Sequence, residues 1–246
     1  MVAEANQISP RVESVLTEFV NSTRKAFGDD LRSIVLYGSG AEGKLRRTSD
    51  VNIIVVLKQF DENKAAQLRE PLRLAEAAIR LKAMFLLNEE ILPATQSFAV
   101  KFTDVMRRHR VLYGDDPFAS VQLSREDTAF RLRQTLLNLI LRLRESYISR
   151  GSREEQLVAT IADAAGPLRS CASTLLELEG VKVQSAKQAL EEFASSLPEA
   201  EMRSHDLHLL SEARQRQSLR PGVAAPTLLH LIDLSRKMWA RAAALK

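Results

Sequence analysis

The chain has 246 residues, of which 45% are hydrophobic and 27% are charged, a balance typical of globular proteins with one large core or two smaller ones. Its 35 Lys and Arg residues against 31 Asp and Glu residues give a formal net charge of +4. This modest excess suits phosphate-bearing ligands and is weaker than the basic stripes of dedicated nucleic-acid-binding proteins, so the charge alone leaves a nucleic-acid partner open.

The single cysteine, Cys171, excludes an intrachain disulfide and a cysteine-based metal cluster. Its apolar surroundings predict a buried, inert thiol. No apolar run approaches the roughly 20 residues of a membrane-spanning helix, and the first ten residues lack the regions of a signal peptide. We therefore expect a soluble, cytoplasmic protein without a membrane partner.

The first elements of the chain are a helix and two strands. Ser9 and Pro10 form an N-cap and first-turn pair, and apolar residues then recur at helical spacing until Gly28. Two short runs rich in Ile and Val, residues 32–37 and 51–57, predict neighbouring strands of one sheet.

A helix is predicted over residues 63–80, with Pro71 bending or breaking it. Two further strands are expected, and a short helical turn lies between them at residues 89–92. The predicted strands are residues 83–87 and 98–102. Thr103 or Asp104 is then predicted to cap a basic helix that ends at Gly114.

After Pro117 the chain shows only helical patterns. A break is predicted at Gly166-Pro167, and Gly180 is expected to end the stretch that follows it. The expected helices are residues 125–150, the two parts of 152–180, 186–197, 199–217 and 227–245. We predict an N-terminal α/β domain over residues 1–120, with a small mixed sheet and flanking helices, followed by an all-α domain over residues 121–246.

A candidate phosphate-binding turn follows the first predicted strand. The chain reads Gly38-Ser39-Gly40 at this point, where glycine allows close backbone approach and amides at the start of a following helix could hold phosphate oxygens. Ser39 adds a hydroxyl donor. A tripeptide of this kind is by itself more often an ordinary turn, so the interpretation depends on the residues around it.

Asp50 and Asn52 begin the second predicted strand. Because they are two residues apart, their side chains share one face of that strand, and they can point back towards the turn. Lys44 and Arg47, on the connecting loop, are candidates for neutralising a triphosphate, although basic loop residues are often only solvated.

These residues resemble the nucleotidyltransferase superfamily of the minimal bacterial type, related to kanamycin nucleotidyltransferase. Its signature is a hydrophobic strand, Gly-Ser and, about ten residues on, a Ser-Asp-x-Asp strand; the resemblance covers residues 31–57 and extends loosely to Gly114. It implies that Gly38 and Ser39 bind phosphate and that Asp50 is the first of three carboxylates that hold two Mg²⁺ ions.

Two residues depart from this pattern. Asn52 stands where the resemblance implies the second carboxylate, and Lys101, in the strand predicted over residues 98–102, falls where it implies the third. An amide oxygen can coordinate Mg²⁺ without adding charge, whereas an ammonium at roughly 4 Å repels the ion. Lys101 would then bind phosphate directly, or be a solvated residue of an edge strand. Asp104 is explained as a helix cap.

Two functions follow. The favoured hypothesis is a protein that binds a nucleoside triphosphate, or a partner protein, without turnover. The alternative is an active Mg²⁺-dependent nucleotidyltransferase that moves a nucleotidyl group to an acceptor hydroxyl, with Asp50 and Asn52 as catalytic and metal-binding residues. The acceptor is not indicated, and the apolar pattern of the helical domain is equally consistent with a homodimer. Arg203 and His208 form the R-x4-H spacing of HEPN ribonucleases, which chance explains better.

Overall fold

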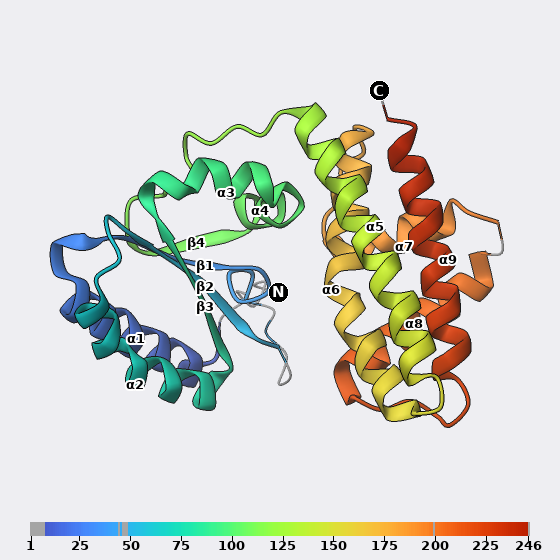
Figure 1. Cartoon of the computed structure of the whole chain (residues 1–246), viewed down its shortest axis with the longest axis horizontal. Coiled ribbons are helices and arrows are strands. Elements are labelled where there is room, and N and C mark those ends of the chain that lie inside the picture. Colours follow the sequence, from blue (N-terminus) through green and yellow to red (C-terminus); the bar gives the residue numbers. More distant parts are fainter. Residues whose placement is uncertain (1–7, 44, 46–48, 199, 246) are drawn as a thin grey trace, which may run out of the picture. The chain divides into compact units, whose positions relative to one another are not determined.

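The computed structural model describes residues 8–43, 45, 49–198 and 200–245 (Figure 1). The chain divides into two compact units. One consists of Met1–Ser97 with Phe102–Gln122, and the other of Phe98–Lys101 with Leu123–Lys246. The boundary near residue 120 between two independent domains, which the sequence analysis expects, stays a prediction. Within the described residues, no helix combines the length and the apolar character needed to cross a membrane.

A four-stranded sheet forms the centre of the first unit. Its strands are β1 (Leu31–Tyr37), β2 (Val51–Leu57), β3 (Leu81–Leu87) and β4 (His109–Gly114). They lie in the order β3-β2-β1-β4; β2 pairs with β3 in parallel, and β1 pairs with both β2 and β4 antiparallel. The small mixed sheet predicted from the sequence is therefore confirmed.

Helices cover both faces of this sheet (Figure 1). They are α1 (Pro10–Phe27) and α2 (Glu62–Ile79) on one face, and α3 (Ile91–Ser97) and α4 (Ala99–Arg107) on the other. Strand β2 is apolar almost throughout because it is buried on both sides: Ile53 and Val55 pack with α1 and α2, whereas Ile54 and Val56 pack with Phe102.

Two predicted elements between residues 98 and 114 were wrong. Residues 99–107 form α4 instead of a strand, and residues 109–114 form strand β4 instead of the end of a basic helix. Phe102 and Val105 are three apart and both fully buried, which is the spacing of one helix face. Val111 and Leu112 pack on opposite faces of the sheet, as consecutive strand residues do.

Gly114 ends β4 at a position that only glycine fits. Its φ is +76°, and a Cβ atom added there would lie 2.0 Å from the carbonyl oxygen of Arg32 on the paired strand. The glycine predicted to end a helix therefore allows β4 to approach β1 closely.

The second unit is all-helical, as predicted. Its helices are α5 (Arg125–Arg150), α6 (Glu154–Leu178), α7 (Ala186–Ser195), α8 (Ala200–Arg216) and α9 (Ala224–Ala243). Helix α6 is buried along most of its length, and α9 packs against both α5 and α6. The Glu154 carboxylate accepts hydrogen bonds from the amides of Gly222 and Ala224 at 2.9 and 3.0 Å, and these amides lower its pKa.

Helices α2 and α6 each contain a proline beyond the first turn, and both are continuous in the structure. Pro71 lies inside α2, and Pro167 lies inside α6, so the break predicted at Gly166-Pro167 was wrong. A proline removes one helical hydrogen bond and costs about 3 kcal/mol in a helix interior. In α6 the burial of side chains on either side, including Ala165 and Leu168, offsets this cost.

Candidate functional site

The end of β1 lies between the beginnings of two other strands. Tyr37, its last residue, pairs with Asn52 of β2 on one side and with His109 of β4 on the other. Residues directly opposite each other in antiparallel strands point to the same face, and Tyr37 packs on the face covered by α4. Asn52 therefore faces the same side of the sheet as Tyr37.

The turn that follows Tyr37 is connected to β4. The amide of Gly38 donates to the carbonyl of Arg108 at 3.1 Å, and the amides of Ala41 and Glu42 donate to the Gly38 carbonyl at 3.1 and 3.3 Å. Gly38 has a φ of +71°. The described residues between β1 and β2 form turns and no helix, so the expected helix N-terminus for phosphate binding is not there. The roles of Gly38 and Ser39 in binding phosphate stay predictions.

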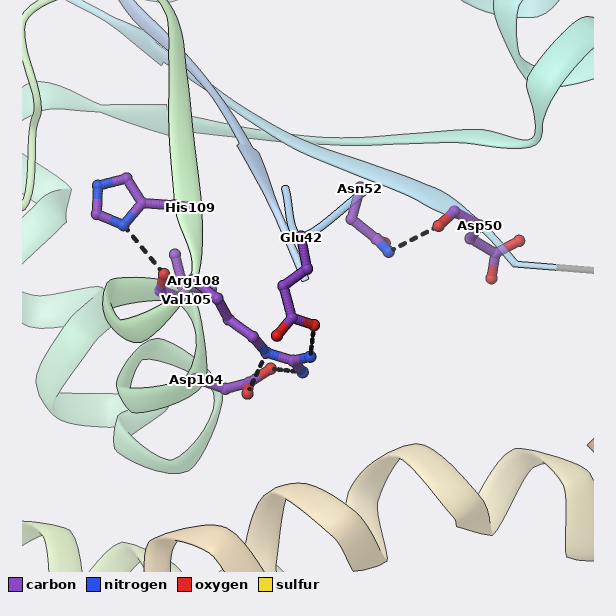
Figure 2. A network of polar contacts seen from close by, with 7 residues as sticks. All are labelled: Glu42, Asp50, Asn52, Asp104, Val105, Arg108 and His109. Carbon is purple, nitrogen blue, oxygen red and sulfur yellow. Dashed lines mark hydrogen bonds and ion pairs between the residues drawn. The ribbon is translucent and has the colours of Figure 1, made fainter. Parts of the chain in front are cut away.

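The two polar residues at the start of β2 have partners within the chain. The Asp50 carboxylate forms an ion pair with Arg80, with Oδ1 and Nε 3.0 Å apart. Arg80 ends α2 in the left-handed conformation, with φ +56°. The Asn52 side-chain amide donates to the Asp50 carbonyl at 3.3 Å (Figure 2). Asp50 thus has an ionic partner within the chain.

A second ion-pair group lies next to the turn. Arg108 donates to both oxygens of Asp104 at 2.6 and 2.7 Å, and to Oε2 of Glu42 at 2.9 Å (Figure 2). The three side chains are between 15% and 23% exposed. Burial alone would lower the pKa of Arg108, but its hydrogen bonds to Asp104 and Glu42 outweigh burial and raise it. Arg108 is therefore a permanently charged link between the turn and α4.

Two neighbouring side chains support this group. Burial, with a smaller contribution from the charge of Asp104, raises the pKa of Tyr37 to about 12, so the phenol stays neutral. His109 places Nδ1 3.1 Å from the Val105 carbonyl and Nε2 3.1 Å from Asp116. His109 thereby connects the first residue of β4 to the last turn of α4.

The structure brings only some of the predicted site residues together. Asn52 pairs with Tyr37, directly before the Gly-Ser turn, and the Asp50 carboxylate pairs with Arg80 at the end of α2. Lys44 and Arg47 fall outside the described residues. Lys101 lies in α4 and belongs to the second compact unit. The strand that aligned Lys101 with a third carboxylate does not exist, and its role in binding phosphate stays a prediction.

Sequence reasoning missed Glu42 and the pairing of Asp104 with Arg108. Asp104 lies inside α4, so its interpretation as a helix cap was wrong, and its carboxylate pairs with Arg108. The four-residue spacing of Asp104 and Arg108 is the signal that could have identified this pair. Glu42 carries no signal beyond its place directly after the glycine-rich turn.

No family model matches the chain. Over 53 residues it is 38% identical to a protein of Methanocaldococcus jannaschii named "Putative protein adenylyltransferase". The match takes in 22% of this chain and 36% of that protein, so the chain spans about a third of the length of this relative.

A solved structure resembles the chain over nearly its whole length. It is spectinomycin adenyltransferase AAD(9) from Enterococcus faecialis, crystallised with ATP and spectinomycin. The similarity covers 91% of this chain and 99% of that one, with a TM-score of 0.65 and 15% identity. The chain therefore shares the fold of this adenyltransferase. The fold expected from the resemblance of residues 31–57 is thus confirmed.

The residues at this edge of the sheet do not fit a site for two Mg²⁺ ions. Mg²⁺ requires several oxygen ligands in near-octahedral geometry. Within the described ranges, no group of three or more His, Cys, Asp or Glu residues could hold a metal ion. On β3 the residue paired with Asn52 is Lys82, which forms an ion pair with Glu76. The carboxylates of Asp50, Glu42 and Asp104 are each paired with an arginine.

Proposed function

We propose that this chain binds a nucleoside triphosphate at the edge of its sheet where β1 ends and β2 and β4 begin, without Mg²⁺-dependent transfer. The observation that carries the proposal is the pairing of Tyr37 with both Asn52 and His109. Because of this pairing, the Gly-Ser turn follows a residue that has Asn52 of β2 on one side and the beginning of β4, next to Arg108, on the other.

Several groups at this edge can bind phosphate oxygens. Ser39 has a hydroxyl, Asn52 has a side-chain amide and Arg108 has a charged guanidinium, and all three donor types are common phosphate ligands. Lys44, Arg47 and Lys101 remain proposed as further phosphate ligands. The solved adenyltransferase with the same fold was crystallised with ATP, which supports a nucleotide as the ligand here.

The pairing of each carboxylate supports binding without transfer. Asp50 is paired with Arg80, and Asp104 and Glu42 share Arg108. A Mg²⁺ ion would have to displace these cations, and at Asn52 it would find an amide that contributes no charge. The nucleotide's negative charge would instead be neutralised by side chains, which hold their charge without a metal.

Calorimetric titration of the protein with ATP tests this function. We expect binding in the presence of EDTA, little change on adding Mg²⁺, and no pyrophosphate release with any acceptor. Release that disappears in Asp50→Ala, and persists in the control Asp163→Ala, would overturn the proposal. Asp163 is exposed on α6 in the other compact unit, so this control removes one carboxylate outside the site.

The second candidate is an active Mg²⁺-dependent nucleotidyltransferase. It is favoured by the extent of the similarity to spectinomycin adenyltransferase, which takes in 91% of this chain. The acceptor panel should therefore include spectinomycin, and also a protein acceptor because the sequence relative is named as a protein adenylyltransferase. Mg²⁺-dependent modification of either acceptor would favour this candidate over the first.

A further inference from the structure

The Arg108 side chain has donors to spare. A guanidinium carries five N–H groups, and the hydrogen bonds of Arg108 to Asp104 and Glu42 employ three of them. In the part of the chain that the structure describes, the other two are available for a further acceptor. At 23% exposure the side chain is accessible to a ligand that approaches the turn.

The two carboxylate partners of Arg108 are held differently. Asp104 lies four residues earlier in the same segment of chain and accepts two hydrogen bonds, which is the stronger, bidentate arrangement. From Arg108, Glu42 accepts one hydrogen bond, and it comes from a turn with Gly40 and Gly43 close by. The Glu42 bond is therefore the one that an incoming anion can replace at lower cost.

The sheet sets the position of Arg108 relative to Asn52 at the start of β2. Arg108 directly precedes β4, and Asn52 lies on β2, with β1 between them. Two strand spacings separate such residues by roughly 10 Å. A nucleotide phosphate chain lying over the Gly-Ser turn would thus have Arg108 on one side and Asn52 on the other.

We propose that Arg108 supplies the positive charge for the bound triphosphate, and that Glu42 occupies Arg108 until a phosphate oxygen replaces it. This exchange rests on the function proposed above. It adds that a carboxylate of the chain itself competes with the phosphate for Arg108. Removing the charge of Glu42 should strengthen nucleotide binding, because it removes both the competing acceptor and the repulsion between carboxylate and phosphate. Removing the charge of Arg108 should weaken binding.

The test is calorimetric titration with ATP in EDTA. We expect Glu42→Gln to bind roughly fivefold more tightly than the wild-type protein, and Arg108→Gln to bind roughly tenfold more weakly. The matched controls are Glu13→Gln and Arg110→Gln. Glu13 and Arg110 form an exposed ion pair in the same unit, with nitrogen and oxygen 3.1 Å apart, so the two controls repeat the same charge changes outside the site.

Thermal unfolding of Arg108→Gln shows whether this variant is still folded. Arg108→Lys is a second variant that tests the role of the charge in binding. The lysine keeps the charge without the fork of donors, so we expect intermediate affinity. If the wild-type protein binds ATP and Glu42→Gln binds no more tightly than Glu13→Gln, the exchange is overturned while the proposed function stands. If neither the wild-type protein nor Glu42→Gln binds ATP, both are overturned.

Discussion

The hydroxyl of Tyr37, at the end of β1, is kept neutral by its burial and by the nearby negative charge of Asp104 on α4, which together raise its pKa to about 12. An unfolded tyrosine has a pKa near 10. Between these two values the unfolded chain releases a proton that the folded chain retains. The contribution of the protonated Tyr37 hydroxyl to stability is therefore fully present below pH 10 and is lost as the pH rises towards 12.

Replacing Tyr37 by Phe should remove this alkaline loss. The rise of the pKa to about 12 corresponds to at most ~3 kcal/mol. Denaturant unfolding at pH 9 and at pH 11.5 measures it, and the free energy of unfolding of the wild-type protein should fall further than that of Tyr37→Phe. Equal losses in the two proteins would contradict the assignment to Tyr37.

Asp104→Asn should destabilise the first unit. Among the described residues, the substitution leaves the partly buried charge of Arg108 with Glu42 alone as an ionic partner, which costs roughly 1–3 kcal/mol. Chemical denaturation measures the loss. Glu70→Gln is the control, because Glu70 pairs with Arg73 on an exposed surface of α2 and the loss of such a pair is usually not measurable. Equal stability of both variants would mean that the Asp104 pair contributes nothing.

Pro167→Ala should stabilise the helical unit by about 1–3 kcal/mol, because alanine restores the amide that proline lacks in the interior of α6. The side chain of Pro167 is exposed, so little packing is lost. Pro226→Ala is the control. Pro226 lies in the first turn of α9, where the missing amide has no helical partner, and thermal unfolding of this variant should show no comparable gain.

Cys171 should react with a thiol reagent only when the helical unit opens. It is fully buried in α6, and burial raises the pKa of its thiol to about 12. The sequence predicted a buried, inert thiol, and its burial is thus confirmed. We expect no labelling of the native protein by a disulfide reagent on the minute timescale, and complete labelling in denaturant. Rapid labelling in native buffer would show frequent local opening of α6.

The sequence was sufficient to predict the part of the fold where local pattern and burial agree. Strands β1 and β2 are buried on both sides and read as continuous apolar runs, and α5 has a clear cap at Ser124 and helical spacing throughout. The Gly-Ser turn and Asn52 were predicted to lie side by side, and the β1–β2 register places them so.

The region from residue 98 to residue 114 could not be predicted from local pattern alone. Its short apolar runs fit a helix or a strand equally well, and long-range pairing decides between them, because β4 exists by pairing with β1. The same uncertainty hid the ion-pair partners of Arg108, because Arg108 was assigned to a basic helix and its contact with Glu42 spans 66 residues of chain. Long-range ion pairs of this kind leave no periodic signal.

Helix α9 packs against α5, the first helix of its unit, and against α6. During synthesis α5 and α6 emerge well before α9, at roughly 5–20 residues per second. The side of α5 that α9 covers therefore stays exposed to water for several seconds while the intervening residues are made. The nascent chain therefore passes through a partly assembled helical unit with an uncovered apolar surface until α9 completes the core.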